Sequence, residues 1–425
     1  MNPTRITALP NGFRVATTPL HGSRAAALGL WIRVGGRHEE KRQNGISHFL
    51  EHLVFKGTRR RSLQELREAI EGRGGAMNAF TAEEVTCYTA KVPSQRAIET
   101  LDVLLDMALN AALKPSDVEK ERAVIGEEIK MVEDQPAQQT DESLRKLLWP
   151  DHPMGRPLTG TPASLAALGR ADLAAFRDRR YTPDAMTLSA SGDVNHGAIL
   201  RFCRKATRRF RPALAPRPEP APVGPSRPLF SLVPKKTEQA QIAVAVHALP
   251  FGHPEQYTLS ILNLILGGNM SSRLFHVIRE EKALAYDISS SVERHSDTGA
   301  WIIDAGVDPG KASKALASLL AQCKRLKKDR VSRGELRRAK DYLLGQFVTG
   351  LDNPLDVMHW TGEEVVTGNR VRNFAEIRKG VERATADGIR RLARRLLETR
   401  SLRAVVLGPF RTADKSRLER LLTLD

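Results

Sequence analysis

Two histidines and a glutamate within one short segment could form a hydrolytic metal site. His48 and His52 are four residues apart, so on a helix both side chains lie on one face, within reach of a single cation. Glu51 lies on that face as well. Two neutral imidazoles can hold an ion that lowers the pKa of a water molecule, and a carboxylate beside it can accept the proton. The segment therefore predicts metal-assisted hydrolysis with Glu51 as general base, although the pattern should arise by chance in about one or two percent of chains this long.

A catalytic zinc site needs a third protein ligand from elsewhere in the fold. A helix expected at 117–133 carries Glu121 and Glu128, which are seven residues apart and share a face with Val118 and Ile125. Buried carboxylates are costly unless they are paired or bound to a metal. We predict Glu128 as the third ligand of one zinc ion per chain and Glu121 as the residue that orients a ligand. Without the histidines, the better interpretation is that both are exposed acids on a charged helix.

The elements that must position these residues are predicted from hydrophobic spacing. In the first half we expect strands at 25–34 and 186–194, helices at 45–55 and 117–133, and one long strand or a hairpin at 78–92. In the second half we expect strands at 240–247, 300–307 and 402–408, and a helix at 256–266. The order of elements is similar in both halves, which predicts a duplicated α+β unit.

A proline-rich segment separates the two halves. Prolines recur from Pro212 to Pro228 and exclude both helix and central strand, so 211–228 is predicted to be an extended linker. The chain is thereby divided into an N-terminal zinc-binding catalytic lobe at 1–210 and a C-terminal lobe at 229–425 that completes the substrate site.

The composition limits the class of protein. With 41% hydrophobic and 27% charged residues, the chain is typical of globular proteins, and no run of about eighteen apolar residues could span a bilayer. The start of the chain lacks a signal-peptide pattern, so we expect a cytoplasmic protein with no membrane partner. Three cysteines in no CxxC pair indicate neither disulfides nor a thiolate zinc site. The net charge of +17 is spread along the sequence, so a nucleic-acid partner is not expected.

Several motifs together resemble one peptidase family. They are His48-Phe49-Leu50-Glu51-His52, Phe55-Lys56-Gly57-Thr58, Asn78-Ala79-Phe80-Thr81, the segments 121–129, 151–157, 181–183 and 192–194, and in the second half 267–275 and 279–286. This set resembles the inverzincin metallopeptidases, the group of pitrilysin, insulin-degrading enzyme and mitochondrial processing peptidase, and in particular its short bacterial processing-peptidase-like branch. The resemblance covers nearly the whole chain.

The resemblance implies roles for further residues. Asn78, Ala79 and Phe80 would lie on an edge strand to which an extended peptide adds through main-chain hydrogen bonds. Arg279 and Tyr286 would reach from the second half to the substrate or to the developing oxyanion. The alternative for this pair is a surface arginine and a half-buried tyrosine.

One position departs from the family pattern. The resemblance implies glycine where this chain has Ala283, a difference that concerns the local turn and not the chemistry.

The expected protein is thus an α+β chain of two similar duplicated lobes, each a mainly antiparallel sheet covered by helices, which form a clamshell. It would hydrolyse extended or unfolded peptides when the lobes close over them. The active form would be a monomer, a homodimer or a heterodimer with a paralogue. Two alternatives are a catalytically silent structural or partner subunit of the same fold, and a nucleic-acid-binding protein, suggested only by the charge.

Overall fold

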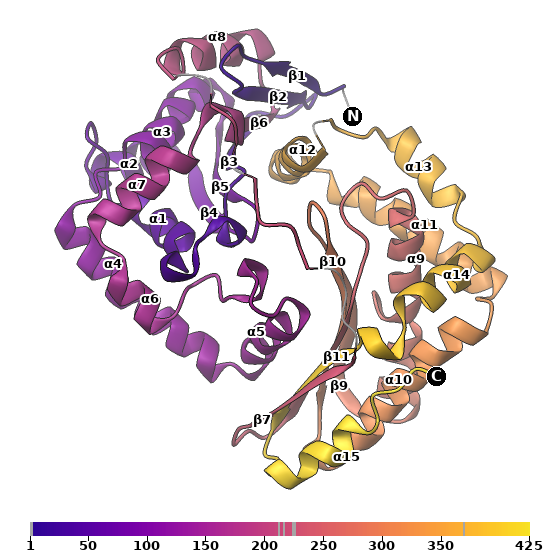
Figure 1. Ribbon diagram of the computed structural model, residues 1–425. Helices are drawn as coiled ribbons and strands as arrows, with labels where there is room; N and C mark the ends of the chain where they lie inside the picture. Colours follow the sequence, from indigo (N-terminus) through magenta and orange to yellow (C-terminus); the bar gives the residue numbers. More distant parts are fainter. Residues whose placement is uncertain (1–2, 211–212, 216, 223–226, 369) are drawn as a thin grey trace. The chain divides into compact units, whose positions relative to one another are not determined.

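The computed structural model describes residues 3–210, 213–215, 217–222, 227–368 and 370–425 (Figure 1). The linker predicted at 211–228 lies partly outside these described residues; where it is described, it contains neither helix nor strand. The chain forms two compact units. Unit 1 comprises 1–130, 156–219 and 348–373, and unit 2 comprises 131–155, 220–347 and 374–425.

Unit 1 is built on a six-stranded sheet. Its strands are β1 (Arg5–Ala8), β2 (Arg14–Pro19), β3 (Ala25–Ile32), β4 (Ala76–Thr81), β5 (Thr86–Pro93) and β6 (Met186–Gly192). They are ordered β1-β2-β6-β3-β5-β4, and every neighbouring pair is antiparallel except β2 with β6. The segment predicted at 78–92 is a hairpin, so that β4 forms an edge of the sheet.

Unit 2 is built on a five-stranded sheet of matching topology. Its strands are β7 (Leu229–Pro234), β8 (Ala240–His247), β9 (Ala285–Arg294), β10 (Gly299–Val307) and β11 (Arg403–Gly408). The order β7-β11-β8-β10-β9 reproduces β2-β6-β3-β5-β4, down to the single parallel pair, β7 with β11. The predicted fold class of two similar, mainly antiparallel α+β lobes is confirmed.

Helices complete both units. Within the first half of the chain lie α1 (Ile46–Val54), α2 (Leu63–Ile70), α3 (Ala97–Asn110), α4 (Pro115–Asp134), α5 (Pro136–Leu148), α6 (Pro162–Ala167), α7 (Arg170–Arg180) and α8 (His196–Ala206). The second half contributes α9 (Gln256–Leu266), the π-helix η7 (Phe275–Glu281), α10 (Ala312–Lys328), α11 (Arg333–Gly350), α12 (Pro354–Gly368), α13 (Phe374–Glu382), α14 (Ala386–Leu396) and α15 (Lys415–Glu419). No helix among the described residues combines the length and hydropathy needed to cross a bilayer.

Two helices are exchanged between the linear halves. Helix α5 packs on β8 and β11 of unit 2, whereas α12 packs on β6, β3 and β2 of unit 1. Glycines allow α12 to approach closely, because a Cβ at Gly29 would lie 2.2 Å from Met358 Sδ and one at Gly362 would lie 2.0 Å from Trp31 Nε1. The division into lobes at 210 and 229 remains a proposal. Each compact unit is assembled from three segments that alternate along the sequence with those of the other unit.

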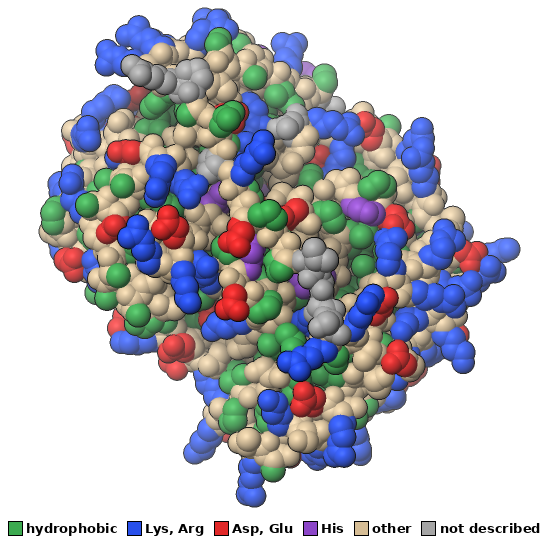
Figure 2. All heavy atoms as spheres, in the orientation of Figure 1, with side chains coloured by type: hydrophobic (Ala, Val, Ile, Leu, Met, Phe, Trp, Pro, Cys, Tyr) green, Lys and Arg blue, Asp and Glu red, His purple; other side chains and the backbone are tan. Residues whose placement is uncertain are grey.

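Lysine and arginine side chains are spread over the face drawn in Figure 2, with aspartate and glutamate among them. Several charged side chains of the protein form exposed ion pairs, such as Arg96 with Glu99 and Lys130 with Glu127. Such pairs contribute little to stability, because water and salt screen the charges.

Ala283, where the family resemblance leads us to expect glycine, has a φ of +47°, in the left-handed region. Alanine pays a steric penalty there that glycine avoids. We therefore expect Ala283→Gly to raise the free energy of unfolding by about 0.5–1 kcal/mol. Urea denaturation would measure this, with Ala321→Gly on the exposed face of α10 as a control that should instead lower stability by about 1 kcal/mol. A loss of stability in Ala283→Gly would contradict this reason for glycine.

Candidate metal centre

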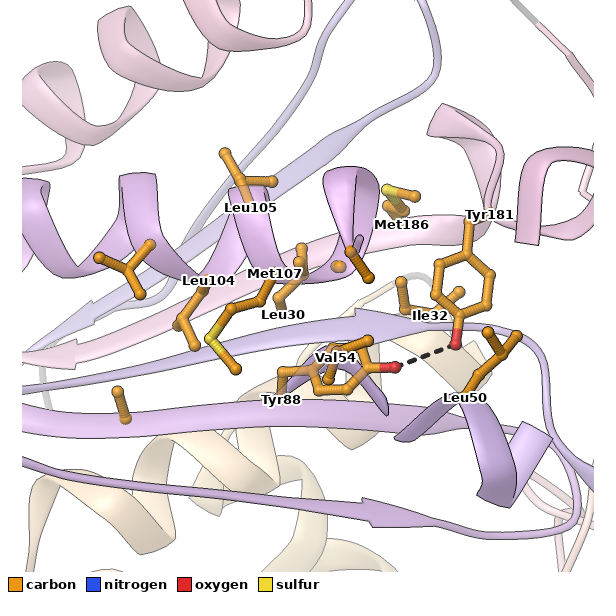
Figure 3. Close-up of a cluster of buried hydrophobic side chains, with 14 of the residues drawn as sticks. Leu30, Ile32, Leu50, Val54, Tyr88, Leu104, Leu105, Met107, Tyr181 and Met186 are labelled. Carbon is orange, nitrogen blue, oxygen red and sulfur yellow. Dashed lines mark hydrogen bonds between the residues drawn. The ribbon is translucent and has the colours of Figure 1, made fainter. Parts of the chain in front are cut away.

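Helix α1 is fixed by its buried face. Phe49, Leu50, Leu53 and Val54 are all at most 1% exposed and belong to the core of unit 1. In Figure 3, Leu50 and Val54 lie beside Tyr88 of β5 and Tyr181, whose hydroxyls are hydrogen-bonded at 3.0 Å. The polar residues of α1 therefore occupy the remaining face of the helix, as the sequence predicts.

The first turn of α1 is held by a buried carboxylate that the sequence does not reveal. Glu39 is 3% exposed and accepts hydrogen bonds from the backbone N–H of Gly45 at 2.8 Å and of Ser47 at 2.9 Å. Burial raises the pKa of Glu39, and these hydrogen bonds oppose the shift. Negative charge at a helix N-terminus also interacts favourably with the helix dipole. Glu39 thus anchors the helix one residue before His48.

Replacing Glu39 with alanine should lower the free energy of unfolding by about 2–4 kcal/mol, because two buried N–H groups lose their acceptor. Chemical denaturation would measure the loss. Glu40→Gln is the matched control, since Glu40 is the exposed neighbouring glutamate, and it should change stability by less than about 0.5 kcal/mol. Equal effects of the two substitutions would show that Glu39 has no such role.

His48, His52 and Glu128 come together as a cluster able to hold a metal ion. One ligand atom from each lies within 4.8 Å of the others, and the Glu128 carboxylate is 3.8 Å from His48 Nε2 and 3.6 Å from His52 Nε2. Around tetrahedral zinc, ligand bonds of about 2.0–2.1 Å place ligand atoms about 3.3 Å apart. The spacing and the two-imidazole, one-carboxylate donor set therefore fit zinc, with a fourth position left open.

Burial keeps the first imidazole in the form that binds metal. The pKa of His48 is lowered to about 4, mainly by desolvation and also by the neighbouring His52. Its ring is therefore neutral at pH 7, as a metal ligand must be. Within the described part of the chain, His48 Nδ1 has no hydrogen-bond partner.

The second imidazole contacts Glu121, the residue predicted to orient a ligand. Glu121, 6% exposed, lies with its Oε2 3.2 Å from His52 Nδ1. When Nδ1 donates its proton to Glu121, the Nε2 lone pair is directed at Glu128 and any bound ion. Lys56 adds a contact that the sequence did not reveal, because its Nζ lies 2.6 Å from Glu121 Oε1 and balances that buried charge.

Glu51 lies on the same helix, held by the hairpin. Thr81, the last residue of β4, donates its hydroxyl to Glu51 Oε2 at 2.6 Å. Burial raises the pKa of Glu51, which makes its carboxylate a stronger proton acceptor near neutral pH. This contact ties the edge strand directly to the predicted general base.

The structure places Asn78, Ala79 and Phe80 on edge strand β4. The Ala79 N–H donates to the side-chain oxygen of Asn78 at 2.8 Å, whereas the Ala82 N–H donates to the Val85 carbonyl across the hairpin. In an antiparallel pair, every second residue of a strand directs its backbone N–H and C=O groups towards the partner strand. Because Ala82 does so, the odd-numbered residues of β4 present their backbone groups to the free edge.

Arg279 and Tyr286 lie within unit 2, next to each other. The Arg279 guanidinium stands 4.7 Å from the centre of the Phe275 ring and 5.8 Å from that of Tyr286. Tyr286 is 76% exposed, so the alternative of a half-buried tyrosine is wrong. Their predicted contact with substrate stays a prediction.

Comparisons with known proteins agree with this fold. Residues 14–162 match the insulinase family, peptidase family M16, and residues 167–343 match the peptidase M16 inactive domain. The chain belongs to this metallopeptidase family, which confirms the resemblance noted in the sequence.

Individual relatives extend over nearly the whole chain. An uncharacterised zinc protease of Mycobacterium tuberculosis is 35% identical over 410 residues, 95% of this chain and 93% of that protein. The mitochondrial-processing peptidase subunit beta of Saccharomyces cerevisiae is 28% identical over 421 residues, 95% of this chain and 91% of that subunit. The crystal structure of a protease from Helicobacter pylori has the same fold, with a TM-score of 0.90 at 22% identity over 96% of this chain and 100% of that one.

Proposed function

We propose that the protein is a zinc-dependent endopeptidase that hydrolyses extended or unfolded peptides. The observation that carries the proposal is the convergence of His48, His52 and Glu128 on one point beside Glu51. These three residues would hold one zinc ion per chain. When bound, zinc supplies Lewis acidity, which acidifies water and polarises a peptide carbonyl.

The chain's own residues would then manage protons and charge. Glu51 would accept a proton at its carboxylate and pass it to the leaving amine, while Thr81 keeps that carboxylate in place. Glu121 would hold His52 in the tautomer that leaves Nε2 free, and Lys56 would hold the Glu121 carboxylate in place through their ion pair. Arg279 and Tyr286 would donate hydrogen bonds to the substrate or to the oxyanion, once the two lobes close over it.

The substrate would add to the free edge of β4 as a further strand. Backbone groups at Met77 and Ala79 face this edge. Pairing through main-chain hydrogen bonds recognises the extended backbone of a peptide and depends only weakly on its side chains. A peptide must be unfolded or flexible to pair in this way. Folded proteins should therefore resist cleavage.

A catalytically silent subunit of the same fold is the alternative, and the complete donor set argues against it. The test is incubation of the purified, zinc-loaded protein with an unstructured peptide library, followed by mass spectrometry. We expect cleavage that a chelator abolishes and added zinc restores. A zinc-loaded protein that leaves every peptide intact would favour the silent subunit.

Running the assay across protein concentrations, and after size-exclusion chromatography, would show whether the active form is a monomer, a homodimer or a heterodimer with a paralogue.

A further inference from the structure

A buried guanidinium in unit 1 joins the proline-rich linker to the β4–β5 hairpin. Arg37 is 1% exposed; its Nε and Nη2 donate to the backbone carbonyl of Glu219 at 3.1 and 2.6 Å, and its Nη1 donates to Glu84 Oε1 at 2.6 Å. Glu219 lies in the described part of the linker, and Glu84 lies in the turn between β4 and β5. One side chain therefore contacts both segments.

The chemistry of arginine suits this position. Its planar group presents several N–H donors in a fixed fork, so one edge can bind a carbonyl oxygen while another N–H binds a carboxylate. A lysine carries a compact ammonium and cannot reproduce this geometry toward two acceptors. A buried positive charge is costly unless its donors are satisfied, which favours the arrangement in which Glu219 and Glu84 both stay in contact with Arg37.

The backbone around Arg37 binds the same hairpin turn. The Gly36 N–H donates to the Ala82 carbonyl at 3.2 Å, and the Arg37 N–H donates to the Glu83 carbonyl at 2.7 Å. Gly35 permits this close approach, because a Cβ there would lie 2.0 Å from the Ala82 oxygen. The segment that carries Arg37 is thus fixed to the turn by its backbone as well as by its side chain.

This segment also lies between two supports of Glu51. The hairpin supports Glu51 directly, because Thr81, the residue before Ala82, donates its hydroxyl to the Glu51 carboxylate at 2.6 Å. Helix α1, which carries Glu51, is anchored by Glu39, which follows Arg37 closely in the chain and accepts hydrogen bonds from the first turn of the helix. A displacement of Arg37 would therefore reach Glu51 through both supports.

The linker leaves unit 1 directly after this contact. Glu219 ends a segment of unit 1, and Pro220 begins a segment of unit 2. Within unit 2, the Ala221 N–H donates to Asp297 Oδ2 at 3.0 Å, in the turn between β9 and β10. Only Pro220 separates the two anchored residues, and its ring restricts the backbone there. Closure of the lobes, as proposed above, would act on this short segment.

We propose that Arg37 is a positioning residue that couples the docking of the linker at Glu219 to the placement of the Glu51 carboxylate. While the linker is docked, the guanidinium holds the β4–β5 turn, and Thr81 holds Glu51 for proton transfer. Release of the linker removes two hydrogen bonds of the buried guanidinium and loosens the turn. The inference rests on the proposed function, because it concerns the residue assigned there as general base.

Arg37→Lys tests the coupling, since lysine keeps the charge and removes the fork. A fluorescent probe on Glu219→Cys reports linker docking by its anisotropy; the Glu219 side chain is exposed and its carbonyl remains, while the native cysteines are buried and should not be labelled. In Arg37→Lys the anisotropy should fall. The kcat for a peptide that the unsubstituted protein cuts should fall by about 10- to 100-fold, as expected for a displacement of about 1 Å. KM should change by less than about twofold.

Zinc affinity is measured on the same samples and should be unchanged, because the three ligand residues are unaltered. Arg42→Lys is the matched control, since Arg42 lies in the same connection between β3 and α1 but its side chain is 77% exposed; it should change none of these quantities. A linker that stays docked in Arg37→Lys, or is released with kcat unchanged, would overturn the coupling. A fall in kcat that merely follows a loss of bound zinc would do so too, because it would show a structural role alone.

Glu84→Gln is an independent variant that serves if Arg37→Lys does not fold. It weakens the contact between Arg37 and the hairpin while the linker stays docked, so kcat should fall by a smaller factor with the probe anisotropy unchanged. An unaltered kcat in this variant would speak against the coupling.

Crystal structures of the unsubstituted and Arg37→Lys proteins give a readout that needs no turnover; Glu84→Gln replaces Arg37→Lys here if the latter does not fold. In the variant, the Thr81 hydroxyl should lie farther than about 3.5 Å from Glu51 Oε2, beyond hydrogen-bond distance. If the unsubstituted protein cuts no peptide, the proposed hydrolysis fails, but these structures still decide the coupling. A Thr81–Glu51 hydrogen bond that persists in the variant would refute it.

Discussion

Replacing Glu51 with glutamine should lower kcat by about 10³-fold or more and leave bound zinc in place. Glutamine keeps the shape of the side chain and can still accept the Thr81 hydroxyl bond, but it cannot accept a proton from water. Because the three ligand residues are unchanged, the metal content should match that of the unsubstituted protein. Peptide cleavage assays combined with elemental analysis of the same samples would measure both quantities.

Glu127→Gln is the matched control for this experiment. Glu127 lies beside Glu128 on α4, but its side chain is 70% exposed and paired with Lys130, so its charge should not affect turnover. Near-normal activity in Glu51→Gln, with zinc still bound, would exclude Glu51 as the general base.

Replacing His52 with alanine should remove the metal. Two ligands would remain, His48 and Glu128. Replacing a residue that only holds a ligand in place already lowers metal affinity by about 10- to 100-fold, so losing a ligand itself should lower zinc affinity by more than about 100-fold. The fold should survive, because Glu121 keeps its ion pair with Lys56 when the imidazole is gone. Competition with a fluorescent zinc chelator would give the affinity, and thermal unfolding of the metal-free forms would check the fold.

The control here is His21→Ala, which removes an exposed histidine from the same unit and should leave zinc affinity unchanged. If His52→Ala retained zinc with unaltered affinity, the ion would have to be bound elsewhere in the protein.

The pairing of the two histidines and of the two glutamates could be predicted from the sequence because each spacing follows from helix geometry. A four-residue interval aligns His48 with His52, and a seven-residue interval aligns Glu121 with Glu128 on the face of α4 that carries buried Val118 and Ile125. Strand alternation similarly located the segment 78–92, expected as one long strand or a hairpin, which forms the β4–β5 hairpin. These features depend on local periodicity, which a single sequence shows directly.

Contacts between distant segments could not be predicted in this way. Glu39 stabilises α1 through backbone N–H groups, and Lys56 balances Glu121, which lies far along the chain. The sequence hints only weakly at the packing of α12 on β3. The residues of β3 are almost all apolar, which predicts a strand covered on both faces, as the structure shows. Nothing in the sequence shows which helix covers the second face, since that depends on tertiary packing.

The most direct test of the account is an anomalous difference map collected above and below the zinc absorption edge from crystals of the zinc-loaded protein. We expect one strong peak per chain, within about 2.0–2.2 Å of His48 Nε2, His52 Nε2 and the Glu128 carboxylate. A zinc-loaded crystal with no peak among these three side chains, or with its only peak elsewhere, would contradict the assignment on which the proposed hydrolysis depends.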